Sequence, residues 1–240
     1  MAALTEAVLL GTWEAALGLG TVRRALTLAV AAGAEPATVA DLAVGHRDGF
    51  LLSLREGWFG PGWSCLVSCP ACAEELELEL SEKDVRVVPP DGDAGTVAVD
   101  GYELDVRPVT SRDLLVVRRE APDARRRLLE RCVVVARSEG REVPAPELPD
   151  AVLAALPAAL STRDPQADVR LDLDCVACGH QWAAPFDIGA YLWTELDAYA
   201  RRLLHEVHAL ARGYGWSERD VLAVSPARRR YYLELAGSVV

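Results

Sequence analysis

Hydrophobic residues recur at helical spacing over the first 60 residues. The apolar side chains of residues 4–17 fall near one face of a helix, and Gly18 and Gly20 end that pattern. A second helix is predicted over 22–33, and a short helix followed by a longer one over 37–59. Glycine and proline directly after residue 59 close this stretch, because neither residue type favours a continuing helix.

A strict alternation of charged and apolar residues replaces the helical period after residue 63. The sequence ELELEL at 75–80 predicts a half-exposed strand whose leucines, Leu76, Leu78 and Leu80, face inward. Residues 169–173 alternate in the same way. Short strands are also predicted around a loop at 89–95 and a turn at residues 100–101.

Helical periodicity returns in the remaining segments, and most of their starts carry a capping residue or a proline. The predictions are a helix start at Thr110 or Ser111, helices over 122–140 and 146–160 (the latter kinked or split at Pro157), a long helix over 188–215, and short helices over 218–224 and 226–236 that begin after Ser217 and Ser225.

Composition and charge narrow the class of partner. The chain has 240 residues, 51% of them apolar, and a net charge of -11. That charge repels phosphate backbones and anionic lipid, so neither nucleic acid nor a membrane is the expected partner. The apolar run at 25–34 is too short to span a bilayer, and no basic start followed by an apolar segment indicates export. We therefore expect a cytoplasmic protein with reduced thiols.

Two cysteine pairs carry the clearest chemical signal. Cys69 and Cys72 lie in CPAC, Cys175 and Cys178 lie in CVAC, and each pair adjoins an alternating segment. Cysteines at this spacing can turn both thiolates toward one ion, and zinc takes four such ligands in a tetrahedron. The pattern predicts a zinc ribbon with one structural zinc per chain. Because four cysteines leave no open coordination position, no catalytic residue is expected.

Alternatives to this zinc site remain at this point. An iron–sulfur cluster also takes four thiolates, and spacing alone does not exclude it. Cys65 and His180 lie close enough in sequence to replace a ligand, although a buried thiol and a surface imidazole are the simpler interpretations. His205 and His208 flank Glu206 but lie three apart, whereas the metalloprotease helix requires four. Cys132 is expected to pack inside a helix.

The predicted fold class is α+β and mainly helical, with a small antiparallel zinc-ribbon sheet and an inserted helical segment. The expected organisation is an N-terminal helical segment (1–62), zinc-ribbon halves (63–83 and 167–187), an inserted strand and helix segment (84–166) and a C-terminal helical segment (188–240). A long insertion is tolerable, because the entropy of loop closure grows only slowly with loop length.

The C-terminal block 186–235 resembles phage baseplate proteins related to those of the T-even phages, whose relatives occur in contractile tails and phage-tail-like contractile injection systems. The similarity extends to CVACGHQW at 175–182, to GHRDGFLLSLREGWFGP at 45–61 with the following CPAC, and to TSRDLL at 110–115. Ala73 departs from the family pattern, which has a glycine after the first cysteine pair. The resemblance implies a role in building the baseplate or its hub, with other baseplate, hub or spike proteins as partners.

Aromatic residues near the C-terminus are candidates for partner contacts, because aromatic anchors dominate protein interfaces. We expect Trp193, Trp216, Arg229 and Tyr232 to contact a partner, alongside a core-packing role for most aromatic residues of this block. Two other functions are kept as alternatives. One is a nucleic-acid-binding zinc-ribbon regulator, which the acidic charge disfavours, and the other is a zinc hydrolase using His180 or the helix around His205.

Overall fold

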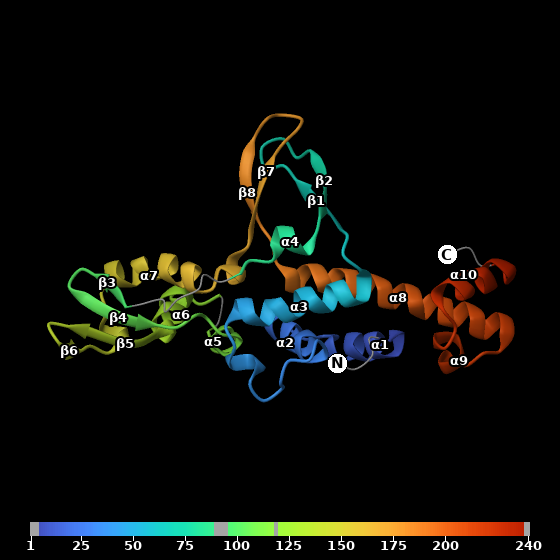
Figure 1. The fold of residues 1–240 in the computed structure, drawn as a ribbon, viewed down its shortest axis with the longest axis horizontal. Coiled ribbons are helices and arrows are strands. Elements are labelled where there is room, and N and C mark those ends of the chain that lie inside the picture. The colour runs from blue at the N-terminus through green and yellow to red at the C-terminus, as the bar shows by residue number, and fades with distance from the viewer. Residues whose placement is uncertain (1–4, 89–95, 118–119, 238–240) are drawn as a thin grey trace. The chain divides into compact units, whose positions relative to one another are not determined.

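The computed structural model describes residues 5–88, 96–117 and 120–237, so the loop predicted at 89–95 lies outside the described residues. The fold is α+β, about 55% helical, with small antiparallel sheets (Figure 1). This confirms the prediction of a mainly helical α+β chain. The chain divides into two compact units, here called the terminal unit (Met1–Leu19 with Ala190–Val240) and the central unit (Gly20–Gly189). None of the helices in the described ranges combines the length and apolar character that a bilayer crossing requires.

The terminal unit is built from helices whose starts follow the sequence predictions. Thr5 caps its first helix by accepting a hydrogen bond from the Val8 N–H, and Ser217 forms a capping box with Asp220. Pro226 occupies the first turn of the last helix, where its missing N–H costs nothing. The helices are α1 (Glu6–Ala16), α8 (Ile188–Tyr214, which begins in the central unit), α9 (Glu218–Leu222) and α10 (Pro226–Leu235).

A buried arginine joins three helices of the terminal unit. Arg229 is 1% exposed and donates to both carboxylate oxygens of Glu6 at 2.5 and 2.6 Å. Its Nε also donates to Glu206 at 2.8 Å. Burial alone would lower the pKa of Arg229, but the two carboxylates outweigh it and raise that pKa. The guanidinium therefore links α10 to α1 and α8.

The central unit contains a helical layer, two hairpins and a four-stranded sheet with its own helices. Its elements are α2 (Thr21–Ala31), the 3₁₀-helix η1 (Val39–Asp41), α3 (Val44–Phe59), β1 (Trp63–Ser68), β2 (Glu75–Leu80), α4 (Glu82–Val85), β3 (Val97–Val99), β4 (Tyr102–Val106), α5 (Ser111–Val116), α6 (Ala124–Cys132), β5 (Val133–Ser138), β6 (Arg141–Glu142), η2 (Ala145–Glu147), α7 (Asp150–Arg163), η3 (Pro165–Asp168), β7 (Arg170–Asp174) and β8 (Gln181–Pro185).

The four-stranded sheet is antiparallel in the order β3-β4-β5-β6. Its turns at Asp100–Gly101 and Glu139–Gly140 have positive φ at both central residues, as tight hairpins require. The first of these turns was predicted. Together with α6 and α7 the sheet encloses a separate hydrophobic core, made of Leu104, Leu129, Cys132, Ala136, Leu148, Val152, Leu153, Leu156 and Leu160.

Two helix predictions in this segment need correction. The predicted helix over 122–140 ends at Cys132, and Val133–Ser138 forms strand β5 instead. Three consecutive valines begin this strand, and β-branched side chains pack better on a pleated sheet than on a helix. Of the two outcomes predicted at Pro157, a kink or a split, the split does not occur, because α7 runs through Pro157 as one helix whose inward leucines pack in the hydrophobic core.

Asp113 connects the sheet with α5 and α6. Its side chain is 1% exposed and accepts hydrogen bonds from Arg107 at 2.6 and 3.0 Å and from Arg131 at 2.8 Å. The Thr110 N–H adds a capping bond at 3.0 Å. Burial would raise the pKa of Asp113, but these donors outweigh it and hold the pKa well below its usual range.

Replacing Asp113 with Asn should lower the free energy of unfolding at pH 7 by about 2–4 kcal/mol, because two arginines lose a buried partner. A carboxyl whose pKa is depressed by folding stabilises the fold above its unfolded pKa of about 3.9 and loses that effect as the pH falls. The difference between wild type and variant should therefore begin to shrink below about pH 5 and shrink further as the pH falls toward the depressed folded pKa, as measured by urea unfolding at each pH. Asp168→Asn, in an exposed pair with Arg170, is the control and should change stability by less than about 1 kcal/mol. An equal loss in both variants would contradict the assignment.

Candidate metal centre

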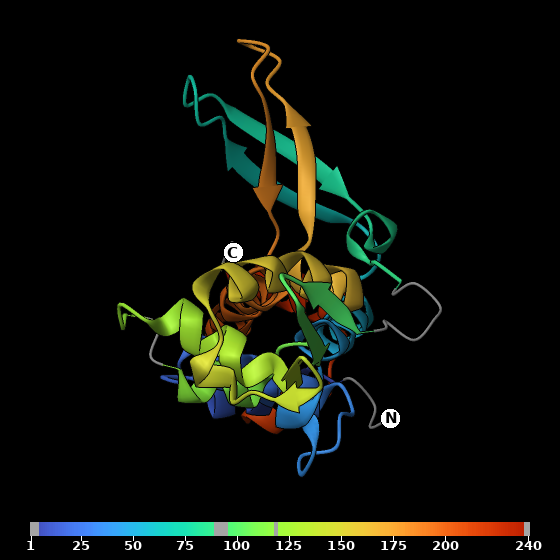
Figure 2. The same ribbon diagram turned by 90° about the vertical axis from the view of Figure 1, so that its left-hand side faces the viewer.

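Both cysteine pairs lie at the tips of two-stranded hairpins. Strands β1 and β2 flank Cys69–Cys72, and strands β7 and β8 flank Cys175–Cys178. Figures 1 and 2 show the hairpins side by side, projecting from the helices of the central unit with their tips at the same end. We call Trp63–Leu80 and Arg170–Pro185 together the arm.

The alternation of side chains along the arm follows the sequence pattern. Leu76, Leu78 and Leu80 are half-buried, whereas the glutamates between them are exposed. Strand β7 repeats this arrangement. Each hairpin therefore has an apolar face and a polar face, as predicted for half-exposed strands.

The two cysteine turns have the same backbone hydrogen bonds. In the first, the Cys69 N–H donates to the Glu74 carbonyl at 2.8 Å and the Ala73 N–H donates to the Cys69 carbonyl at 2.9 Å. In the second, the Cys175 N–H donates to the His180 carbonyl at 2.9 Å and the Gly179 N–H donates to the Cys175 carbonyl at 2.8 Å. The equivalence shows that the two pairs are the same local structure built twice.

A left-handed residue is part of both turns. Ala73 has φ 61° and Gly179 has φ 72°, and each follows the second cysteine of its pair. Glycine adopts this conformation freely, whereas alanine is strained there by its Cβ. The positive φ thus explains why a glycine suits this position and why Ala73 is strained there.

The four sulfurs converge at the tips of the hairpins. All four Sγ atoms lie within 4.8 Å of one another, with Cys72 and Cys175 in contact at 3.6 Å and Cys69 and Cys178 in contact at 3.8 Å. Tetrahedral zinc with bonds of about 2.3 Å places its sulfur ligands about 3.8 Å apart. Iron–sulfur clusters divide their thiolates among several irons, which spreads the sulfurs more widely. The spacing therefore fits a single thiophilic ion.

Electrostatics within the sulfur cluster also favours a cation. Burial opposes ionisation of Cys69, but N–H groups of Ala71 and Cys72 and the neighbouring thiols outweigh it and bring the pKa of Cys69 to about 7. The Glu74 N–H favours the Cys72 thiolate, yet the other three sulfurs and burial raise the pKa of Cys72 to about 12. Four adjacent thiols cannot all ionise without a positive charge among them, and a metal ion supplies that charge.

An aromatic contact joins the hairpins at their other end. Trp63, 2% exposed, starts β1 and packs on Phe186 just after β8, with ring centroids 5.7 Å apart. The Arg55 guanidinium of α3 lies 4.9 Å from the Trp63 ring centre. This contact was not predicted from the sequence. In the sequence, this contact is marked by an aromatic residue in each hairpin, at the strand end that lies away from the cysteine turn.

Other candidate ligands lie outside the sulfur cluster. The His180 ring stacks on Trp182 with centroids 5.9 Å apart, and Cys65 is half-buried in β1 opposite Leu78. Cys132 is fully buried, as expected for a packing thiol, although it ends its helix. Glu206 is bound by Arg229. Among the described residues, the four cysteines are the group of potential ligands whose donor atoms converge.

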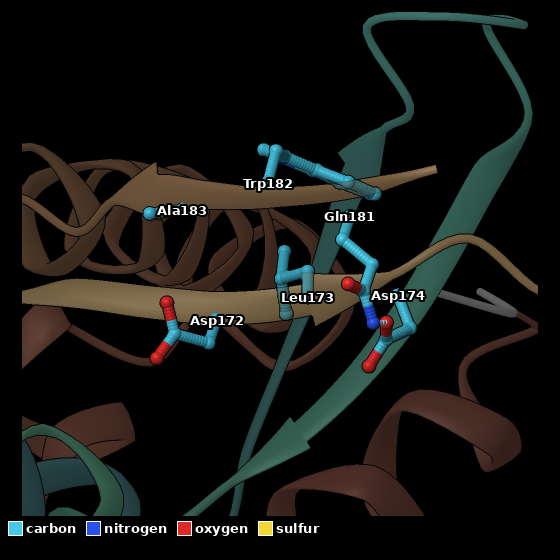
Figure 3. A pocket seen from close by; sticks show the side chains of 6 residues that line it. All are labelled: Asp172, Leu173, Asp174, Gln181, Trp182 and Ala183. Carbon is cyan, nitrogen blue, oxygen red and sulfur yellow. Dashed lines mark hydrogen bonds between the residues drawn. The ribbon is translucent and has the colours of Figure 1, made fainter. Parts of the chain in front are cut away.

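A shallow pocket lies along the second hairpin (Figure 3). Its lining includes Leu173, Trp182 and Ala183, and the Gln181 amide donates to the Asp174 carboxylate. Asp172 adds a second carboxylate. The described lining residues are Asp172, Leu173, Asp174, Gln181, Trp182 and Ala183, so the polar side-chain groups of the pocket are two carboxylates, one amide and one indole N–H.

The four expected partner contacts occupy different environments. Trp216 and Tyr232 are partly buried and pack edge to face, with centroids 5.0 Å apart, beside the small core of Leu210, Val221 and Leu233. Trp193 is also partly buried. Arg229 is fully buried in ion pairs, so its place in the structure is that of a core residue.

No family model, curated protein or solved structure matches this chain.

The left-handed residues give a test of the two turns. Ala73→Gly should raise the free energy of unfolding by about 0.5–1 kcal/mol, because relief of about 1–2 kcal/mol of strain exceeds the extra entropy of an unfolded glycine. Gly179→Ala should lower it by a similar amount through the backbone alone, since nothing lies within 4 Å of the added Cβ. Urea unfolding of both variants beside the wild type measures the effect. Gly179→Ala with unchanged stability would show that the turns differ from this description.

Proposed function

We propose that this chain is a non-enzymatic, zinc-stabilised structural or assembly component of the baseplate of a contractile phage tail or injection system. The observation that carries the proposal is the convergence of four cysteine sulfurs from hairpins 103 to 109 residues apart in the sequence. Four thiolates complete the tetrahedral coordination of one zinc, so the ion holds segments together and leaves no position for substrate.

The zinc-ribbon interpretation is supported by the repeated unit of strand, cysteine turn and strand. The segment 84–166 then reads as an insertion between the two halves of the ribbon, with its own hydrophobic core. Structural zinc sites of small domains contribute about 10–16 kcal/mol of apparent binding free energy, which is enough to offset the closure of a long loop.

The surface of the arm favours a protein partner over nucleic acid. Exposed carboxylates line its polar faces, at Glu75, Glu77, Glu79, Asp172 and Asp174. Four thiolates around one divalent ion add two further negative charges. Leu66 and Val176 are 68% and 90% exposed on the same arm and offer apolar contacts. A basic protein surface fits this combination, whereas a phosphate backbone is repelled.

The baseplate assignment draws on the resemblance of residues 186–235, together with the turns and α3, to baseplate proteins of contractile particles. It makes other baseplate, hub or spike proteins the partners and the cytoplasm the place of assembly. The hydrolase alternative is less well supported, because Glu206 is bound to a buried arginine and His205 and His208 are exposed.

Purified protein should contain about one zinc per chain, measured by inductively coupled plasma mass spectrometry. Cys72→Ser and Cys178→Ser should each lose the metal and lower the melting temperature, because metal binding is coupled to folding. Cys65→Ser is the matched control, since Cys65 lies on the same hairpin outside the sulfur cluster, and it should keep the metal. Unchanged melting after complete chelation under reducing conditions would contradict a structural metal.

The assembly role is tested by deleting the gene in the cell that produces the particle. Electron microscopy should then show no complete contractile particles, because a baseplate component is required before the sheath assembles. Cys65→Ser should restore assembly, whereas Cys72→Ser should not. Normal particles in the deletion strain would refute the assembly role without affecting the metal site.

A further inference from the structure

The cluster sulfurs fall into two classes by exposure. Cys72 and Cys178 are exposed, whereas Cys69 and Cys175 are each 2% exposed. Each turn therefore buries its first cysteine and leaves its second exposed. A dissolved oxidant reaches Cys72 and Cys178 first, because these are the exposed cysteines and oxidation requires access.

Two sulfur–sulfur contacts join opposite hairpins. Cys72 Sγ lies 3.6 Å from Cys175 Sγ, and Cys178 Sγ lies 3.8 Å from Cys69 Sγ. Each close pair thus joins the exposed sulfur of one hairpin to the buried sulfur of the other. A disulfide requires a sulfur separation of about 2.05 Å, so each pair has less than about 2 Å to close.

We infer that the sulfur cluster is a peroxide-modifiable clamp. A metal ion joins the hairpins while the thiols are reduced, and hydroperoxides convert the cluster to two cross-hairpin disulfides, Cys72–Cys175 and Cys69–Cys178. The inference rests on the metal site of the proposed function and adds a chemistry that this function does not require.

The oxidation balances with hydrogen peroxide as the oxidant. The Cys72 thiolate attacks one peroxide oxygen, the O–O bond breaks, hydroxide leaves and a sulfenic acid forms on Cys72. The Cys175 thiolate then attacks the Cys72 sulfur, the S–O bond breaks, and the departing hydroxide takes up a proton. Each peroxide accepts two electrons from one pair of thiolates and, with two protons, yields two waters. A second peroxide oxidises Cys178 and Cys69 in the same way, and the metal ion leaves with its charge unchanged.

Oxidation in this pattern preserves the closure of the arm. Disulfides within CPAC and CVAC would close only the turns and would leave the hairpins unconnected. Cross-hairpin disulfides instead join residues 103 and 109 apart in sequence, as the metal does. A particle that leaves a reducing cell would keep its arm closed in oxidising surroundings, where disulfides persist.

The test uses the full-length, zinc-loaded protein treated with hydrogen peroxide and digested with trypsin without reduction. Cleavage after Arg55, Lys83, Arg170 and Arg201 places the two cysteine pairs on separate peptides, 56–83 and 171–201. We expect loss of four thiols together with release of the zinc, and one species in which the two peptides are linked. Fragmentation between the cysteines should give the pairs 72–175 and 69–178. Cys65→Ser, which removes the remaining cysteine of peptide 56–83, should give the same linkage.

Separate peptides with internal disulfides, the pairs 69–175 and 72–178, or zinc retained beside four free thiols would each overturn the inference. Failure of the proposed metal site has a different signature, since the chain would then purify without zinc before any peroxide is added.

Hydrogen exchange gives a second readout that requires no variant. After chelation with reductant, amide protection in 63–80 and 170–185 should fall by at least about tenfold, because the hairpins lose their link. After oxidation and chelation, protection should stay within about threefold of the zinc form. Equal loss in both metal-free states would show that the disulfides do not hold the arm.

Discussion

The arm depends on one constraint, which is that sulfurs from two distant hairpins must meet at one point. An isolated two-stranded hairpin is marginally stable in water, and each hairpin of the arm is a two-stranded sheet among the described residues. Their half-buried leucines cannot be covered within one hairpin. The Trp63–Phe186 contact holds the pair at one end, and the cysteines hold it at the other. Two separated points of attachment fix both the spacing and the orientation of the hairpins.

The segment 84–166 returns the chain from the first hairpin to the second, so that their cysteines can meet. This segment is itself folded, with a hydrophobic core enclosed by its sheet, α6 and α7. Asp113 strengthens this body by joining strand, capping turn and helix through one carboxylate. Because the insertion is ordered by its own contacts, the entropy of closing the loop is far smaller than for a flexible chain of that length. The Cys175 turn is therefore delivered by a folded scaffold.

Local chemistry made much of this structure predictable. The repeated cysteine spacing identified the four residues that converge, and the alternation of Glu and Leu gave the strands beside them. Caps such as Thr110 and Ser217 were found because their hydrogen bonds are local.

The errors arose where contacts between residues distant in sequence decide the structure. The Val133–Ser138 strand directly follows a genuine helix, and apart from its run of valines it is the pairing with β4 and β6 that separates the two. Arg229 was expected to contact a partner, but it is buried in ion pairs with Glu206, 23 residues away, and Glu6, 223 residues away.

The negative charges on the arm oppose association through its unpaired strand edges. Two separate hairpins carry unpaired strand edges, which are templates for association with any other strand. The carboxylates on their polar faces repel another copy of the same arm, so they oppose self-pairing without weakening the metal site at the tips. For the partner proposed above, the same charges favour a basic surface, because opposite charge speeds encounter. Leu66 and Val176, exposed on the same arm, would add apolar contacts once such a surface has docked. In that proposal one group of side chains opposes self-pairing of the arm and favours its partner, while the four sulfurs independently bring the tips of the hairpins together.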